Sequence, residues 1–350
     1  MRKILFLLLS GVQMWAVQAQ PSSGHTPPFL EKSLSGAAIR QVTAETSGGN
    51  ISVTGVPDGE ARLEVYIRPN NGGRDETGIG KEEIQRRLNT MYDFAVTVND
   101  NKLTATARPK RGENNWREGL SISFKIYIPQ AVSSTLRTSG GNITLKNLNG
   151  TQDFRTSGGN LDLDQLSGKL TGRTSGGNIS LTDSKDDIDL TTSGGNIEAI
   201  HCDGNIRLIT SGGNLKLRLL KGTIHATTSG GSVQGEEIAG ELQTRTSGGN
   251  IRLRDLACSL TAATSAGDID ITFKTLGKFL DLTNSSGDIS LELPQDKGLD
   301  LKVFAEKIKH TTLNNFKGDI DEHHLDGTMN GGGIPVKLDD NGGRVSLSFK

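Results

Sequence analysis

The sequence predicts an all-β protein, a parallel β-solenoid (β-helix) with 18-residue coils, on three observations. First, the pentapeptide Thr-Ser-Gly-Gly-Asn recurs on an 18-residue period, beginning at Thr138, Thr156, Thr174, Thr192, Thr210 and Thr246. Second, apolar and polar residues alternate within each repeat, which is the period of a strand with one buried face. Third, the chain has 45 glycines but only 33% apolar residues. Such a composition suits a thin core made by stacking short units in register.

Each repeat is expected to supply two short strands separated by two turns. The aligned repeats follow the pattern T-S-G-G-N-[I/L]-x-L-x-x-L-x-G-x-[L/I]-x-[L/A/T]-x. Ser-Gly-Gly forms one turn, and we expect its glycines to supply left-handed backbone conformations. The asparagines should stack as a structural ladder of hydrogen bonds along the array, formed by Asn142, Asn160, Asn178, Asn196, Asn214 and Asn250.

The N-terminus predicts export. Basic Arg2 and Lys3 precede a short apolar run over 4–9, and a small-residue motif predicts signal-peptide cleavage after Ala19. The apolar run is too short to span a bilayer, and no later segment approaches the necessary length. We therefore expect a protein of the periplasm, the cell surface or the exterior, without a transmembrane segment after signal cleavage.

A complete repeat copy also begins at Thr46, yet the next copy begins 92 residues later, at Thr138. The segment between them holds several strand-like runs and one helical pattern over 81–92, with Ile84, Leu88 and Met91 on one face. We expect this segment to form a β-rich head or cap on the array.

Beyond Thr264 the period slips, with later echoes at Asn284 and Asn341. This region is expected to form degenerate coils and a cap, because an open solenoid end must be covered. The predicted segments are a signal peptide (1–19), a disordered leader (20–27), the head with the first repeat copy (28–137), the regular solenoid (138–283), and the degenerate coils with the C-terminal cap (284–350).

The sequence resembles a bacterial β-strand-repeat family known as "putative adhesin", whose function is unknown. The resemblance rests on the Glu-Thr-Ser-Gly-Gly-Asn-Ile motif at 45–51, the strand over 65–68 before a short helix, the run 124–129, and Asn330-Gly331-Gly332-Gly333 near the end. It covers nearly all of the predicted mature chain. The family implies the repeat architecture, and it carries no catalytic motif over to this sequence.

The two cysteines, Cys202 and Cys258, are expected to remain free thiols. They lie about three coils apart, and at about 4.8 Å per coil the gap of about 14 Å exceeds the reach of a disulfide. Cys202 occupies a position that leucine holds in other repeats, so it should be buried.

Charge excludes one class of partner, and aromatic residues suggest another. The net charge is −1, with 39 basic and 40 acidic residues, so no overall field favours nucleic acid. Beyond the signal segment, the one Trp and all three Tyr lie in the predicted head. Trp116, Arg111 and Arg117 form a candidate partner-binding loop, since aromatic and arginine side chains favour recognition. The opposing interpretation is a solvated connection.

Sites for metals and for catalysis are weaker interpretations. A cation could bind near Asp268, Asp288 or His323-His324, and His201-Cys202-Asp203 also contains ligand chemistry. Four aspartates at 183, 186, 187 and 189 could serve as acid and base. In each case a structural or solvated role is the favoured interpretation, so we expect no catalytic residue, no cofactor and no metal.

These observations favour an exported, non-enzymatic repeat protein that acts as an adhesin or cell-envelope scaffold. Its partner would be a protein or glycan of the cell surface or envelope. One alternative is an interaction protein that senses envelope stress. Another is a polysaccharide-active enzyme on a β-helix, which would require carboxylates that converge on one groove.

Overall fold

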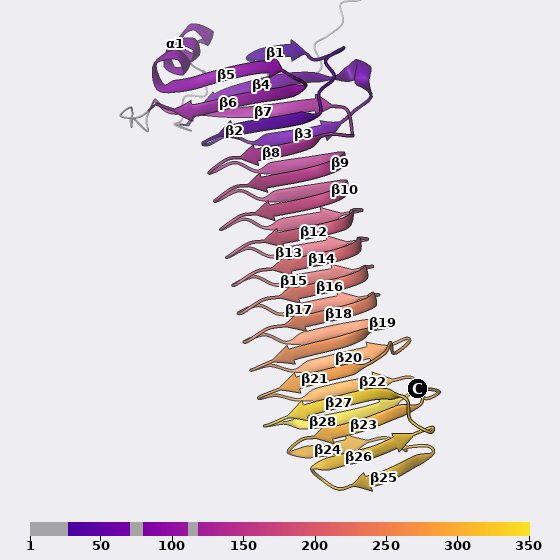
Figure 1. Ribbon diagram of the computed structural model, residues 1–350. Coiled ribbons are helices and arrows are strands. Elements are labelled where there is room, and N and C mark those ends of the chain that lie inside the picture. The colour runs from indigo at the N-terminus through magenta and orange to yellow at the C-terminus, as the bar shows by residue number, and fades with distance from the viewer. Residues whose placement is uncertain (1–26, 71–79, 111–117) are drawn as a thin grey trace, which may run out of the picture.

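The computed structural model describes residues 27–70, 80–110 and 118–350. In these residues the strands form one continuous sheet that winds into a tall, narrow, solenoid-like stack (Figure 1). Helical structure is limited to α1 (Lys81–Met91) and a 3-10 turn (Asp58–Glu60) within the described part of the chain. The predicted all-β class and the predicted helix are therefore confirmed.

Each regular coil contributes to two faces of the stack. The first face consists of β11 (Ile179–Thr182), β13 (Ile197–Ile200), β15 (Leu215–Arg218), β17 (Val233–Glu236), β20 (Ile269–Phe273), β22 (Ile289–Leu293) and β28 (Arg344–Phe349). The second face consists of β12 (Lys185–Thr191), β14 (Asp203–Ile209), β16 (Lys221–Thr227), β18 (Ala239–Arg245), β21 (Leu280–Asn284) and β27 (Ile334–Asp340). Three longer strands take part in both faces, namely β9 (Ile143–Arg155), β10 (Leu161–Arg173) and β19 (Ile251–Thr264).

Equivalent residues of successive coils lie beside one another in the parallel ladders. Leu161 pairs with Ile143 on one side and with Ile179 on the other. The same column continues through Ile197, Leu215, Val233 and Ile251, and its members are at most 1% exposed. Burying one such side chain contributes about 1.5–3 kcal/mol. Each coil thus covers an apolar surface that a lone coil would leave in water.

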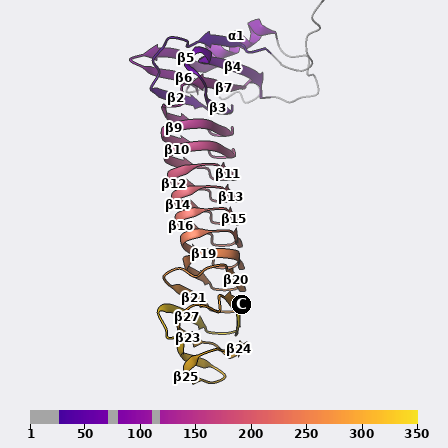
Figure 2. The same cartoon turned by 90° about the vertical axis from the view of Figure 1, so that its right-hand side faces the viewer.

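The head continues the stack (Figure 2). Its strands are β1 (Leu30–Ser33), β2 (Gln41–Thr46), β3 (Ile51–Gly55), β4 (Arg62–Pro69), β5 (Tyr92–Asn99), β6 (Lys102–Pro109), β7 (Leu120–Ile128) and β8 (Ser133–Arg137). The early repeat copy, made by β2 and β3, pairs in parallel with β8 and β9. On its other side it pairs in parallel with β6 and β7. The copies at Thr46 and Thr138 are therefore neighbours in space despite their separation in sequence.

At the C-terminal end, too, the strands do not stack in the order in which they follow in the sequence. β27 and β28 stack on β21 and β22, although four strands intervene in the sequence. These four are β23 (Leu299–Phe304), β24 (Lys307–His310), β25 (Phe316–Ile320) and β26 (His324–Met329). β23 and β24 lie on the far side of the last coil, and β26 and β25 follow as antiparallel strands.

The glycines of the Ser-Gly-Gly turn serve a purpose other than the one predicted. A Cβ placed on Gly177 would lie 1.9 Å from the carbonyl oxygen of Gly159 in the preceding coil, so no side chain fits. The expectation of left-handed glycines at this turn is wrong for the regular coils, because neither glycine of the turn has a positive φ there. Non-glycine residues adopt the left-handed conformation at the opposite corner, with φ between 49° and 56°, at Asn147, Gln165, Asp183, His201, Leu219, Glu237 and Asp255.

Both cysteines are free and Cys202 is buried, as predicted, and Cys258 is buried as well. Burial raises the pKa of Cys202 to about 11 and that of Cys258 to about 12. Neither thiol is therefore ionised near neutral pH. Across residues 27–70, 80–110 and 118–350, none of the helices combines the length and apolarity of a membrane span.

Candidate functional site

The predicted binding loop and the N-terminal signal lie outside the described residues. Trp116, Arg111 and Arg117 belong to residues 111–117, and the predicted signal peptide belongs to residues 1–26. The partner-binding role of this loop therefore stays a prediction.

The asparagine column forms a regular ladder at the turn. The backbone N–H of Asn178 donates to Oδ1 of Asn160 at 2.8 Å, and the N–H of Asn196 donates to Oδ1 of Asn178 at the same distance. The same bond links successive coils along Asn142, Asn160, Asn178, Asn196 and Asn214, and the N–H of Asn250 donates to the hydroxyl of Ser232. Each amide oxygen satisfies a backbone donor that the turn would otherwise leave to solvent.

The threonines that begin the repeats form a second, inner ladder. Thr192 is 1% exposed, and its hydroxyl donates to the carbonyl of Gly177 at 2.8 Å. The same hydroxyl accepts the N–H of Gly195 at 3.3 Å. These threonines thus hold neighbouring turns together from inside the stack.

The acidic residues considered as cation ligands continue the outer ladder. The N–H of Asp268 donates to Asn250 Oδ1 at 2.8 Å, and the N–H of Asp288 donates to Asp268 Oδ1 at 3.0 Å. Asp288 in turn accepts the N–H of Arg344 at 3.0 Å, with its other oxygen 3.4 Å from the Arg344 guanidinium. Each carboxylate therefore accepts a backbone N–H group, as the asparagine side chains do in the other coils.

The histidine candidates belong to turns. His323 and His324 donate their backbone N–H groups to Asp321 Oδ1, both at 2.8 Å, and these bonds lower the pKa of Asp321. His201 pairs with Asp183 of the preceding coil. Among the described residues, no three His, Cys, Asp or Glu side chains converge in a way that would hold a metal ion.

Three of the four aspartates in one coil have separate partners. Asp183 pairs with His201, Asp189 lies 2.9 Å from the Arg207 guanidinium, and Asp186 accepts the N–H of Gly168 at 2.9 Å. Asp187 and Asp189 flank buried Ile188 and face outward. Three of the four aspartates thus have separate local partners, and the group is spread over the coil surface instead of converging on a single groove.

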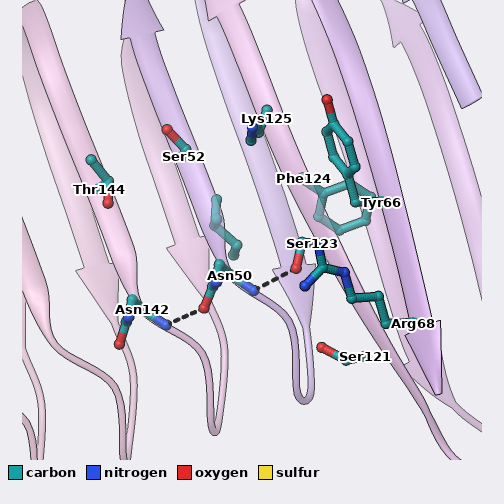
Figure 3. Close-up of a pocket in the computed structure, with 11 residues that line it drawn as sticks. Asn50, Ser52, Tyr66, Arg68, Ser121, Ser123, Phe124, Lys125, Asn142 and Thr144 are labelled. Atoms are coloured by element: carbon teal, nitrogen blue, oxygen red, sulfur yellow. Dashed lines mark hydrogen bonds between the residues drawn. The ribbon is translucent and has the colours of Figure 1, made fainter. Parts of the chain in front are cut away.

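A different site lies where the head meets the first coils (Figure 3). It is a hollow of about 510 Å³ on the outer surface of β4, β7, β3 and β9, which we call the head groove. The groove is lined by Asn50, Ile51, Ser52, Tyr66, Arg68, Ser121, Ser123, Phe124, Lys125, Asn142 and Thr144.

Strand register places the groove's side chains in rows. Tyr66 lies opposite Ser123, and Arg68 lies opposite Ser121, across the antiparallel β4–β7 pair. Lys125 lies beside Ser52 across the parallel β7–β3 pair. Because side chains alternate across a strand, these residues share the outer face while Phe124 packs beneath them and is fully buried. The floor is therefore well packed, and its rim carries polar groups.

The electrostatics of the groove are set by Tyr66 and its neighbours. The Tyr66 hydroxyl donates to Glu64 Oε2 at 2.9 Å, and Lys125 Nζ lies 4.7 Å from the centre of the Tyr66 ring. Burial, together with this hydrogen bond, raises the pKa of Tyr66 to about 12, so the phenol stays protonated. Burial opposes ionisation of Glu64, but hydrogen bonds from Arg62 and Tyr66 outweigh it and lower its pKa.

These groups favour a ligand with both an anionic group and an apolar face. Arg68 and Lys125 are cationic, Ser52, Ser121, Ser123 and Thr144 offer hydroxyls, and the lining residues include no carboxylate. An aromatic ring beside cationic donors can stack on a sugar ring and bind its carboxylate or sulfate. Next to the groove, Arg62 stacks on Tyr127 at 3.8 Å, which extends this character along the same face.

Sequence reasoning missed this site, although its signal was present. The alternation R-L-E-V-Y-I-R over 62–68 sends arginine, glutamate and tyrosine to one face of a strand. The partner strand adds Lys125 and Tyr127 on the same face. Only the β4–β7 pairing, which joins segments about 60 residues apart, shows that the two sets meet.

A second hollow, of about 540 Å³, lies on the other face of the array. It is bordered by Arg207, His225, Gln243 and Arg245 from three successive coils, and its lining has no aromatic ring other than His225. Arg207 is already paired with Asp189. This hollow therefore offers fewer free recognition groups than the head groove.

The stacked parallel coils and the turn ladders define a solenoid-like β-repeat protein. Residues 204–348 match the family described as Toastrack DUF4097, whose function is unknown. No curated protein matches the sequence.

Two solved structures are similar to the chain. One is a "putative cell adhesion protein" from Clostridium sporogenes ATCC 15579, with 10% identity, 92% of this chain and 99% of that chain covered, and a TM-score of 0.17. The other is a "putative adhesin" from Bacteroides fragilis NCTC 9343, with 14% identity, 92% and 96% covered, and a TM-score of 0.32. Their names describe those proteins.

Proposed function

We propose that the protein is an exported, non-enzymatic binding protein of the cell envelope or surface, and that its head groove binds an acidic glycan. The observation that carries this proposal is the meeting of the Tyr66 ring, Arg68 and Lys125 with hydroxyl groups on one outer face. The stacked coils would hold this groove at one end of a rigid support, in the manner of an adhesin or an envelope scaffold. The signal-like residues 1–19 support export.

An acidic glycan suits the groove better than a neutral one. Uronate or sulfate groups would replace water at Arg68 and Lys125 with charge-assisted hydrogen bonds, each contributing about 1.5–3 kcal/mol. The Tyr66 ring would cover the apolar face of a neighbouring sugar. A phenol that stays protonated adds no negative charge that would repel the ligand.

The array suits a supporting role because its outward charges pair with each other. Lys216 lies 2.7 Å from Glu198 and Arg218 lies 3.2 Å from Glu236, so charges on adjacent coils neutralise one another. Such exposed pairs contribute at most about 1 kcal/mol each. They neutralise part of the charge on this face of the array, away from the head groove.

The proposal is tested by binding to alginate, an acidic polysaccharide, with uncharged dextran for comparison. We expect the parent protein to bind alginate. The affinity should fall at least tenfold in Tyr66→Ala and in the double variant Arg68→Gln/Lys125→Gln, which is a loss of about 1.4 kcal/mol of binding free energy. Lys216→Gln removes one positive charge from the same face several coils away, and it should bind like the parent protein. Protein isolated from the envelope should begin at Gln20.

Three outcomes would contradict the proposal. Equal binding of dextran and alginate would show that Arg68 and Lys125 do not select for an acidic glycan. Equal losses in Lys216→Gln and in the groove variants would indicate general charge attraction. Cleavage of the polysaccharide by the parent protein would favour the enzyme alternative. The acidic residues of the array could then be replaced one at a time to find those that cleavage requires.

A further inference from the structure

The last strand of the stack, β25, has a free edge. It pairs with β26 and with no other described strand. In both views it lies at the end of the array opposite the head (Figures 1 and 2). Four of its five residues are exposed, and no described backbone hydrogen bond outside the β26 ladder involves them. An open edge of this kind is a template for another strand.

The sequence of β25 is complementary to itself in the antiparallel direction. It reads Phe316-Lys317-Gly318-Asp319-Ile320. When two copies are opposed with Gly318 at the centre, Phe316 faces Ile320 and Lys317 faces Asp319 at both ends of the strand. We propose that β25 pairs with β25 of a second copy of this chain, about a two-fold axis through Gly318, to form an end-to-end dimer.

The apolar side chains support this register. Ile320 lies opposite Leu325, which lies opposite Val303, and the last two are buried. Ile320 itself is 41% exposed, so the apolar row ends in water. In the dimer, Phe316 of the second copy continues the row, followed by that copy's Met329 and Leu299. The buried layer of the sheet would then run through the interface without a break.

The charges on the opposite side of the strand support the same register. Asp319 lies directly opposite Asp326, and like charges in this position are destabilising. Lys302 lies on the far side of Asp326, so the row reads positive, negative, negative and then ends. The dimer places Lys317 of the second copy next to Asp319. This added positive charge offsets the repulsion between Asp319 and Asp326 at the end of the row.

The neighbouring edge strand lacks this complementarity. β24 pairs only with β28 among the described strands, and its sequence is Lys307-Ile308-Lys309-His310. Opposed to itself, it would place Ile308 against Lys309 and basic residues against each other. Such lysines protect an edge from pairing. A second copy of β25 is therefore the occupant that fits this end, and it leaves the two heads free at opposite ends of a doubled array.

Charge exchange tests the pairing. Sedimentation velocity of the full chain over a concentration range should show a monomer–dimer equilibrium. Lys317→Asp and Asp319→Lys should each weaken self-association at least tenfold, because each places like charges face to face across the axis. The double variant Lys317→Asp/Asp319→Lys should associate like the parent. A mixture of the two single variants should form a heterodimer, since each then presents the charge that the other lacks.

Lys309→Asp is the matched control, because it changes an exposed charge of the same end in β24, and it should leave association unchanged. Thermal unfolding of every variant checks that the fold is kept. A parent protein that stays monomeric up to about millimolar concentration, beyond the range of weak specific complexes, would overturn the proposal. So would single variants that associate like the parent, or a mixture that fails to form a heterodimer.

Discussion

Asp340 occupies the position that a buried threonine holds in the regular coils. In the same column, the Thr264 hydroxyl donates to the carbonyl of Gly249 at 2.9 Å, and the Asn284 amide donates to the carbonyl of Gly267 at 3.1 Å. Asp340 is fully buried, and its Oδ2 has no partner among the described residues. A protonated carboxyl would supply the donor that this position requires.

Replacing Asp340 by asparagine should stabilise the protein in a way that depends on pH. Burial, with Asp288 and Asp339 nearby, raises the pKa of Asp340 above its ordinary value of 3.8, so the folded state binds the proton more tightly than the unfolded state. The stability from the protonated group is complete below pH 3.8 and is lost as the pH rises through the raised pKa. Asp340→Asn donates at every pH, so we expect a gain of about 1–3 kcal/mol at pH 7.

Urea unfolding of the parent and of Asp340→Asn at pH 7 and near pH 4 measures this gain. The difference in unfolding free energy should shrink at the lower pH. Asn284→Asp is the matched reverse change in the adjacent coil, and it should be destabilising at pH 7. An equal difference between parent and Asp340→Asn at both pH values would contradict a raised pKa of Asp340 in the folded protein.

At the scale of the element, each turn distinguishes its two glycines. A Cβ on Gly177 would meet the Gly159 carbonyl oxygen at 1.9 Å, whereas a Cβ on Gly176 has its nearest neighbour, the Ser157 carbonyl oxygen, at 3.8 Å. The first separation is impossible without moving the backbone of the adjacent coil, and the second is an ordinary contact. The coil spacing of the array is therefore set by one glycine of each pair.

Gly177→Ala should accordingly destabilise the array severely, by more than about 4 kcal/mol, because it separates two coils and breaks the ladder bonds between them. Gly176→Ala should change the unfolding free energy by less than about 1 kcal/mol. Thermal and urea unfolding of the two variants make the comparison. Equal effects at both positions would contradict the close-approach explanation and favour an effect of chain flexibility.

At the scale of the whole molecule, the core is a narrow column inside the array, and the buried side chains of each coil are covered by the adjacent coils. Cys202 and Cys258 lie in different coils of this core, at 2% and 1% exposure. The stability of stacked repeats is the sum of repeat and interface contributions, so the ends and the middle can open separately. The two thiols are natural reporters of such opening.

A thiol reagent should therefore label neither cysteine in the native protein at pH 8, because burial holds both pKa values at about 11 and 12 and blocks access. Both should react once urea unfolds the chain. Ser180→Cys places a thiol at an exposed position on the outer surface and should react at once. Rapid native labelling of Cys202 or Cys258 would mean that the coil around it is open.

The sequence carried much of this architecture because the repeat itself imposes it. A strict period of Thr-Ser-Gly-Gly-Asn with alternating apolar residues admits stacked parallel strands and excludes helices outside the insertion, where the spacing of Ile84, Leu88 and Met91 predicted α1. The burial of Cys202 followed from its place in the same alignment. The left-handed corner residues did not, since Leu219 and Glu237 have no chemical preference that announces a φ of 53° or 54°.

The order of coils at the two ends and the head groove were decided only by tertiary structure. The local pattern determines which side of a strand is buried, but not which open edge it joins. At the head, β2 and β3 lie between strands that follow them in the chain, and β4 folds onto β7 to bring Tyr66 beside Lys125. Local periodicity thus determined the coil, whereas competition between distant strands for free edges determined the ends, where the groove and the free β25 edge lie.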